Sequence, residues 1–97
     1  IIGPGTEIRD SILMGADFFE AEQARADHLA KGLPAIGIGT GCRIERAIVD
    51  KNARIGDRVV VGARAPDAPD EDHEQWALRD GVVVVKKNGI LPDDYRI

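Results

Sequence analysis

The 97-residue sequence lacks several features that define common classes of protein. Its one cysteine, Cys42, can form neither an internal disulfide nor a cysteine-ligated zinc site. No apolar run approaches the length of about 18 residues that a transmembrane helix needs. The start shows no basic segment followed by apolar residues, as a signal peptide would. The net charge of −4 provides no basic footprint for nucleic acid.

Aromatic residues are also scarce. The sequence contains four of them, against 11 isoleucines and 8 valines. β-branched aliphatic residues favour strands, and the 11 glycines are typical of tight corners between strands. The length fits one domain. We therefore expect a single domain built from repeated short, buried strands.

The negative charge is concentrated in one segment. Five acidic residues, and no Lys or Arg, lie from Asp67 to Glu74. Without this segment the sequence is nearly neutral. The acidity therefore characterises one loop and does not indicate a partner for the whole domain.

The sequence repeats itself at a distance of 36 residues, so that residues 2–8 align with residues 38–44. Aliphatic residues also recur in steps of about six. A step of six fits neither an amphipathic helix nor an alternating strand. The identical pairs are Ile2/Ile38, Gly3/Gly39, Gly5/Gly41, Ile8/Ile44 and Ile12/Ile48, and the stepped residues are Ile2, Ile8 and Leu13, then Ile38, Ile44 and Val49, then Ile55 and Val61, then Val85, Leu91 and Ile97.

Such a step predicts a chain that turns a corner every six residues and buries one aliphatic residue at each corner of a triangle. Coils of about 18 residues then stack through short parallel strands into an all-β solenoid of hexapeptide repeats, with about four coils. Glycine follows the aliphatic residue at Gly3, Gly39, Gly56 and Gly62. There a Cβ atom would crowd the turn or prevent a positive φ. The rival interpretation is a small β-sandwich with glycine-rich turns.

Two segments interrupt the repeat. Residues 16–35 are rich in helix formers, with Asp17 as a candidate N-cap, Gly32 as the end and Pro34 beyond it, and they predict a short helical excursion. Residues 63–80 contain two prolines, the acidic run and Trp76, and predict a second, mostly irregular excursion. A solenoid tolerates both because each coil contacts only its neighbours.

The search for catalytic residues finds little. Cys42 has no histidine close in sequence to act as its base, and we interpret it as a small turn residue. His28 lies in the helical excursion and His73 in the acidic one, where a solvated histidine is a better interpretation than a general base. Two histidines do not suffice for a three-histidine zinc site, and no Walker-type phosphate loop is present. We expect no catalytic residue and no metal ligand.

Cationic residues are the remaining candidates. Lys51 and Arg54 lie in one hexad region, and Lys86 and Lys87 follow the aliphatic run 82–85. Lys51 and Lys87 are 36 residues apart, which places them on successive coils once the excursion between them is discounted. Cations on one face bind phosphate or carboxylate. From the residues alone, however, a solvated charged face is the better interpretation.

Four stretches of the sequence closely resemble one protein family, and the resemblance covers essentially the whole chain. They are LMGADFFE (13–20), IGIG (36–39), IERAIVDKNARIG (44–56) and GVVVVKKN (81–88). They are similar to the C-terminal left-handed β-helix domain of glucose-1-phosphate adenylyltransferase, also called ADP-glucose pyrophosphorylase. Residues 1–97 are thus expected to be this β-helix domain, separated from the N-terminal catalytic domain.

The resemblance implies a role in ADP-glucose synthesis. The family makes ADP-glucose and pyrophosphate from ATP and glucose 1-phosphate with Mg²⁺, for glycogen or starch, in the cytoplasm or the plastid. That reaction belongs to a nucleotide-binding domain whose motifs this sequence lacks, so the fragment is expected to be inactive alone and to hold no cofactor. The β-helix domain is expected to pack on its catalytic domain, to contribute to a tetramer and to help bind a phosphorylated effector.

The resemblance also changes the interpretation of the cations. In family branches activated by 3-phosphoglycerate and inhibited by phosphate, two lysines of this domain line the effector site. By motif they correspond to Lys51 and Lys87, with Arg54 as a weaker candidate. Lys86 departs from the family pattern because an aliphatic residue is usual there. The effector site also uses arginines of the catalytic domain, so weak anion binding is expected of the fragment.

Two other functions stay open from the sequence: a free-standing hexapeptide-repeat acyltransferase acting as a trimer, and a purely structural solenoid. Association is also expected at the first coil, because an uncapped coil exposes aliphatic core and strand backbone. Ile1, Ile2 and Ile8 would form this exposed rung. Phe18, Phe19 and Leu29 of the helical excursion are candidates to cover part of the prism.

Overall fold

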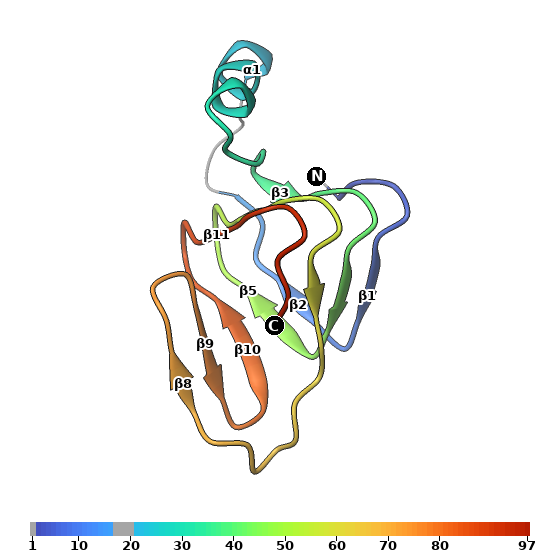
Figure 1. The fold of residues 1–97 in the computed structure, drawn as a ribbon, viewed down its shortest axis with the longest axis vertical. Helices are drawn as coiled ribbons and strands as arrows, with labels where there is room; N and C mark the ends of the chain where they lie inside the picture. Colours follow the sequence, from blue (N-terminus) through green and yellow to red (C-terminus); the bar gives the residue numbers. More distant parts are fainter. Residues whose placement is uncertain (1, 17–20) are drawn as a thin grey trace.

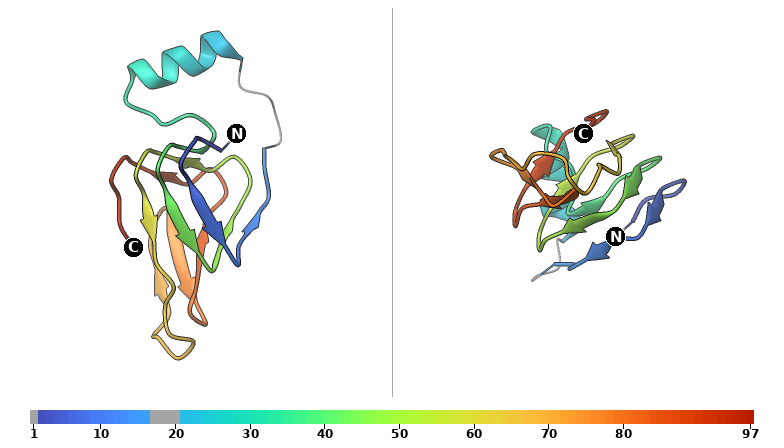
Figure 2. Two further views of the ribbon diagram at one scale, coloured as in Figure 1. Left: turned by 90° about the vertical axis from the view of Figure 1, so that its right-hand side faces the viewer. Right: turned by 90° about the horizontal axis from the view of Figure 1, so that it is seen from below.

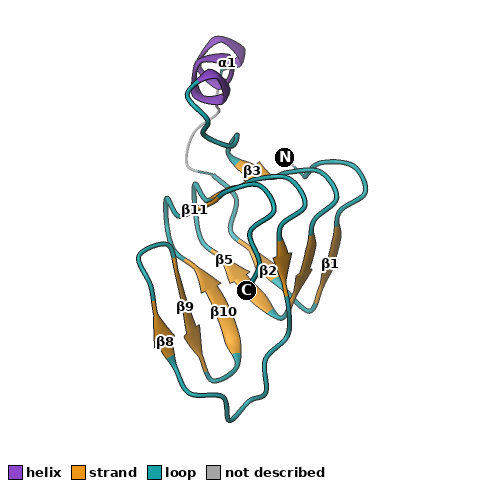
Figure 3. Ribbon diagram, in the orientation of Figure 1, coloured by secondary structure: helices purple, strands orange, loops and turns teal. Residues whose placement is uncertain are grey.

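The computed structural model describes residues 2–16 and 21–97 and shows a chain wound around a three-sided prism (Figures 1 and 2). Within these residues the fold is mostly β, with short parallel strands and one helix (Figure 3). The elements are β1 (Glu7–Arg9), β2 (Ile12–Leu13), α1 (Glu22–Ala30), β3 (Gly37–Ile38), β4 (Arg43–Glu45), β5 (Ala47–Val49), β6 (Arg54–Ile55), β7 (Val60–Val61), β8 (Glu71–Asp72), β9 (Trp76–Arg79), β10 (Val82–Val85) and β11 (Ile90–Leu91).

Each side of the prism is a parallel sheet formed by successive coils. The first face is β1-β4-β7, the second contains β2-β5-β10, and the third is β3-β6-β11. Single bridges extend two of the faces, because Ile2 pairs with Ile38 and Val60 with Arg96. The first and third faces thus contain four stacked segments each, as the prediction of about four coils requires. The expected β-solenoid is confirmed, and the sandwich interpretation is wrong.

The 36-residue repeat is the register of neighbouring coils. Ile8 pairs with Ile44, and Val49 with Val85, each 36 residues on. Where no excursion intervenes the offset is 17 residues, as between Ile44 and Val61, close to the predicted 18. Each excursion therefore leaves the solenoid and returns without changing which residues stack.

The predicted aliphatic residues form three columns inside the prism. Most of them lie within strands on its faces, so the prediction that they lie at the corners is wrong. The best-buried members are Ile44, Ile55, Val61, Val85 and Leu91, all at 1 % exposure or less. At the first coil the columns are open: Ile8 is half-buried, and Ile2 and Leu13 are exposed to 51 % and 37 %. The columns are Ile2, Ile38, Ile55 and Leu91; Ile8, Ile44, Val61 and Ile97; and Leu13, Val49 and Val85.

The glycines after the aliphatic residues are required by crowding. A Cβ on Gly39 would lie 2.5 Å from the Gly56 carbonyl oxygen, and a Cβ on Gly56 would lie 2.7 Å from the Asp93 nitrogen. The alternative reason, a positive φ, is wrong for these positions. After Gly3, Gly39 and Gly56, left-handed backbone occurs two residues further on, at Gly5, Gly41 and Arg58. Gly62 differs from the other three, because its Cβ would meet no atom closer than 3.7 Å.

The helical excursion is confirmed as α1, but it does not cover the core. The helix begins after Ala21, whose side chain makes no capping hydrogen bond, and ends just before Gly32 (φ 81°). None of its residues is buried, and Leu29 is 53 % exposed, so the predicted covering by Leu29 is wrong. The helix instead stands off the side of the solenoid, beyond the third face (Figure 2, left). The predicted N-cap Asp17, and Phe18 and Phe19, lie outside the described residues, as does Ile1.

The second excursion is irregular over most of its length, as predicted, but it also contains two strands that were not predicted. β8 and β9 extend the second face as antiparallel strands beside β10. Trp76, Ala77 and Leu78 are buried, and Asp80 and Gly81 make a two-residue turn with positive φ at both positions. Asp-Gly favours this type of hairpin turn. The hairpin forms because burial of these residues and a turn of suitable chemistry outweigh the acidic, proline-containing composition.

Substitution of the crowded glycine tests the stacking. We expect Gly39→Ala to lower the free energy of unfolding by about 1–3 kcal/mol, because the opposing atoms include the Gly56 backbone, which cannot move aside. Gly62→Ala is the matched control and should change it by less than about 0.5 kcal/mol. The measurement is urea denaturation followed through the fluorescence of Trp76, the single tryptophan. Equal effects of the two variants would contradict this account of the repeat.

A second prediction concerns acid stability. Arg58 donates to both carboxylate oxygens of Asp94 on the next coil, at 2.7 and 3.1 Å. This hydrogen bond lowers the pKa of Asp94. Its stabilisation is therefore complete above the ordinary aspartate pKa of about 3.9 and is lost as the pH falls through the lower pKa of the folded state.

Asp94→Asn is a suitable variant because asparagine tolerates the left-handed backbone found at this position (φ 64°). We expect the wild type to be more stable than the variant at pH 7, and the difference to shrink by pH 3 (about one unit below the ordinary pKa). Denaturation midpoints at the two pH values provide the measurement. A difference that is the same at both would show that the ion pair contributes nothing.

Candidate functional site

The structure brings Lys51 and Lys87 to the same corner of the prism on successive coils. Each lysine follows the strand that forms the second face, β5 or β10, in equivalent register. The Asn88 N–H donates to the Lys51 carbonyl at 3.0 Å, which joins the turns of the two coils directly. Asn52 and Asn88 close the two turns with nearly the same left-handed φ, 62° and 61°. The same turn on two coils is why residues 36 apart become neighbours.

The environments of the two lysines differ. Lys51 is half-buried and Lys87 is exposed. The Lys51 N–H donates to the carboxylate of its neighbour Asp50 at 2.6 Å, which keeps the turn tight. A parallel ladder spaces the two backbones by about 4.8 Å, so a single tetrahedral anion is large enough to contact side chains from both.

Arg54 lies three residues beyond Lys51, in β6, and its guanidinium is engaged by the helical excursion. Nη1 donates to the Pro34 carbonyl at 2.8 Å, and Nη2 lies 3.5 Å from Nδ1 of His28. The structure thus connects this predicted site residue to the segment that carries α1.

Lys86 is directed away from the chain interior and binds the hairpin. Its Nζ donates to the Asp72 carboxylate at 2.8 Å and to the His73 carbonyl. The hydrogen bond lowers the pKa of Asp72, with a further contribution from the charge of Arg79. The segment around Asp72 and His73 thus supplies partners for a lysine where the family resemblance leads us to expect an aliphatic residue.

The other sequence candidates show no catalytic grouping. Cys42 is buried, and its Sγ lies 3.1 Å from the Gly56 carbonyl oxygen. His73 stacks on Trp76 at 4.2 Å between ring centres and lies 3.0 Å from a Glu71 oxygen. Across residues 2–16 and 21–97, no group of three or more His, Cys, Asp or Glu side chains is arranged to hold a metal ion. In the same residues, no helix has the length and apolarity needed to cross a membrane.

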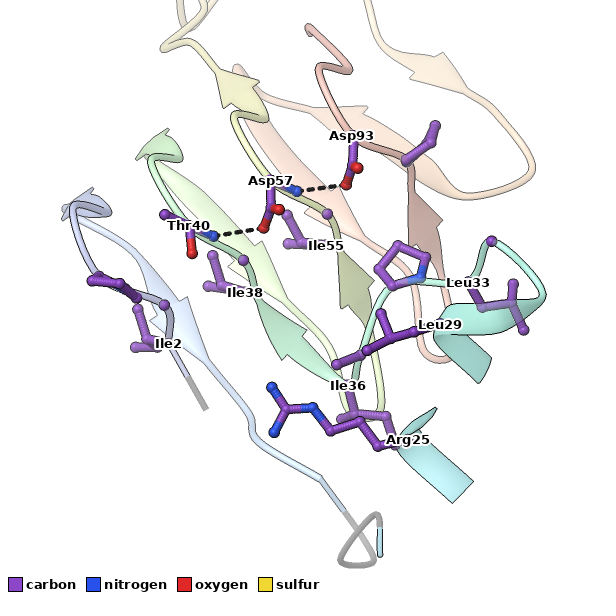
Figure 4. A pocket seen from close by; sticks show the side chains of 18 residues that line it. Ile2, Arg25, Leu29, Leu33, Ile36, Ile38, Thr40, Ile55, Asp57 and Asp93 are labelled. Carbon is purple, nitrogen blue, oxygen red and sulfur yellow. Dashed lines mark hydrogen bonds between the residues drawn. The ribbon is translucent and has the colours of Figure 1, made fainter. Parts of the chain in front are cut away.

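A groove between α1 and the third face was not predicted from the sequence. Its volume is about 690 Å³. Arg25 and Leu29 of α1 form one wall, and the other follows the coil edge, where Thr40, Asp57 and Asp93 lie in a row (Figure 4). The Thr40 N–H donates to Asp57 at 2.9 Å, and the Asp57 N–H donates to Asp93 at 2.8 Å. The groove depends on how the helical excursion folds back on the third face, and no local pattern in the sequence predicts that arrangement.

The first coil presents an apolar end. Ile2, Ile12 and Met14 are 51 %, 61 % and 49 % exposed, and Leu13 is also exposed. β1 and β2 are edge strands of their sheets. The predicted open end is therefore present, and Ile12 and Met14 add to it. Both were missed because they lie outside the six-residue step.

Comparison with known families agrees with this architecture. The family model described as the GLGC left-handed parallel β-helix domain matches residues 1–95. The match spans both excursions and both lysine corners. The three-faced solenoid of short parallel strands agrees with the parallel β-helix that this description names. The chain belongs to the GLGC left-handed parallel β-helix domain family, the β-helix family of ADP-glucose pyrophosphorylase.

Proposed function

We propose that this chain is the regulatory and oligomerisation domain of a glucose-1-phosphate adenylyltransferase, and that Lys51 and Lys87 bind a phosphorylated effector. The observation that carries the proposal is the register that brings both lysines to one corner. The family supplies the reaction, the synthesis of ADP-glucose and pyrophosphate from ATP and glucose 1-phosphate.

The chemistry of the corner suits an anion. Two ammonium groups on adjacent coils act as point charges that a phosphate or carboxylate bridges. Each partly solvated, charge-assisted contact contributes about 1.5–3 kcal/mol at most. Two such contacts give weak binding, so further cations from the catalytic domain complete the site.

Catalysis is assigned to the nucleotide-binding domain of the same enzyme, where ATP and Mg²⁺ react. The partners of the β-helix domain are that catalytic domain and the other subunits of a tetramer, in the cytoplasm or the plastid. Regulation then consists of a ligand at the lysine corner changing how the β-helix domain contacts the catalytic domain.

Self-association is assigned to the first coil. Its exposed aliphatic side chains include those of β2. The unpaired edges of strands β1 and β2 lie at this end of the stack of coils, where another chain could pair with them (Figure 1). An edge strand and an apolar end together favour binding of a further chain. Stacking of that chain would satisfy the unpaired backbone N–H and C=O groups and bury the apolar side chains.

The effector assignment is tested in the full-length enzyme. We expect Lys51→Ala with Lys87→Ala to raise the concentrations of 3-phosphoglycerate and inorganic phosphate needed for half-maximal effect by at least about tenfold, since two contacts are lost. Activity without effector should stay unchanged. Lys31→Ala, a charge removal at the exposed end of α1, is the control. If the double variant responds to both effectors like the wild type, the assignment is wrong.

The oligomerisation assignment is tested by charge at the open end. We expect Ile12→Glu with Leu13→Glu to shift the full-length enzyme toward smaller species in sedimentation velocity, because carboxylates oppose burial of this surface. Leu29→Glu introduces the same charge at an exposed leucine of α1 and should leave the distribution unchanged. A double variant that sediments like the wild type would remove the first coil from the subunit interface.

A further inference from the structure

Helix α1 needs an external support. It has nine residues, none of them buried, and its N-cap residue makes no side-chain hydrogen bond. Isolated helices shorter than about 12 residues are marginal in water. The helix also stands off the coils, as Figure 1 shows, so its position depends on a few contacts with the third face.

Arg54 provides such a support from β6. Its Nη1 makes a charge-assisted hydrogen bond of 2.8 Å to the Pro34 carbonyl, in the segment that leads from α1 to β3. Its Nη2 lies 3.5 Å from Nδ1 of His28, within α1 itself. One guanidinium thus contacts both the helix and its connection. Gly37, the β3 residue in register with Arg54, has no side chain and leaves space for this reach.

The same arginine is tied to the lysine corner. Lys51 lies three residues before Arg54, within one turn and strand. The Arg54 N–H donates to the Gly89 carbonyl at 2.8 Å, and Gly89 follows the Lys87–Asn88 turn on the next coil. Arg54 is therefore joined to both lysine-bearing turns through short, hydrogen-bonded backbone.

We propose that Arg54 is a positioning residue that fixes α1 against the third face and couples α1 to the lysine corner, and that it does not contact the bound anion. The coupling rests on the effector site proposed above, whereas the support of α1 does not. Anion binding at the corner then changes the protection of α1, and loss of Arg54 weakens anion binding while Lys51 and Lys87 remain in place.

Hydrogen exchange of the α1 amides in the full-length enzyme tests the support. We expect Arg54→Ala to raise their exchange rates about tenfold, equivalent to about 1.4 kcal/mol of local opening. Arg54→Lys should restore part of the protection, because one ammonium can still donate to the Pro34 carbonyl. Lys51→Ala with Lys87→Ala is the matched control for loss of charge and should leave α1 unchanged. Unchanged exchange in Arg54→Ala overturns the inference.

Inorganic phosphate is the probe for the coupling. Saturating phosphate should change α1 exchange in the wild type and not in Arg54→Ala. The phosphate concentration for half-maximal inhibition should rise about threefold in Arg54→Ala, less than in the double lysine variant, with partial rescue by Arg54→Lys. If Arg54→Lys restores phosphate inhibition without restoring protection of α1, Arg54 is a ligand and the inference is wrong. An unaltered phosphate response in the lysine variant overturns the effector site but leaves the exchange result for Arg54 standing.

Discussion

The parallel register of neighbouring coils is the constraint on which the rest of this structure depends. Each parallel strand of the coils obtains its backbone hydrogen bonds from a neighbouring coil, so its residues stack on defined partners. Aliphatic residues stack into three columns, glycines stack where there is no room for a Cβ, and turn residues with left-handed backbone stack at the corners. An added side chain at one of the crowded glycines would therefore clash with the backbone of the next coil, which cannot move aside.

The register also creates the candidate site. Between Lys51 and Lys87 the chain leaves the solenoid, forms the β8–β9 hairpin and returns. The hairpin adds length without altering the pairing of Val49 with Val85, so the two lysines still share a corner. The first excursion acts similarly and places α1 near β6, where Arg54 contacts its connection. Regulation, on our proposal, is built from turns of the repeat and from the segments inserted between them.

Much of this architecture was predictable from the sequence because the repeat has a physical cause that leaves a regular trace. The step of six identified the buried columns and their register, and the 36-residue offset placed the lysines together. Strands β8 and β9 were missed because the acidic composition hid a buried Trp76 and the Asp80–Gly81 turn that joins β9 to β10. The direction of Arg54 and the groove beside α1 depend on how an excursion folds back, which composition and periodicity do not determine.

The claim most open to direct measurement is that Lys51 and Lys87 lie close together at the lysine corner. Adjacent parallel strands place partner Cα atoms about 4.8 Å apart, within the range of about 4.4–6.8 Å that a disulfide requires. In a Lys51→Cys, Lys87→Cys variant with Cys42 replaced by serine, mild oxidation should form an intramolecular disulfide between positions 51 and 87, detected by mass spectrometry of the non-reduced digest. Two thiols that stay free under these conditions would contradict the register and, with it, the shared anion site.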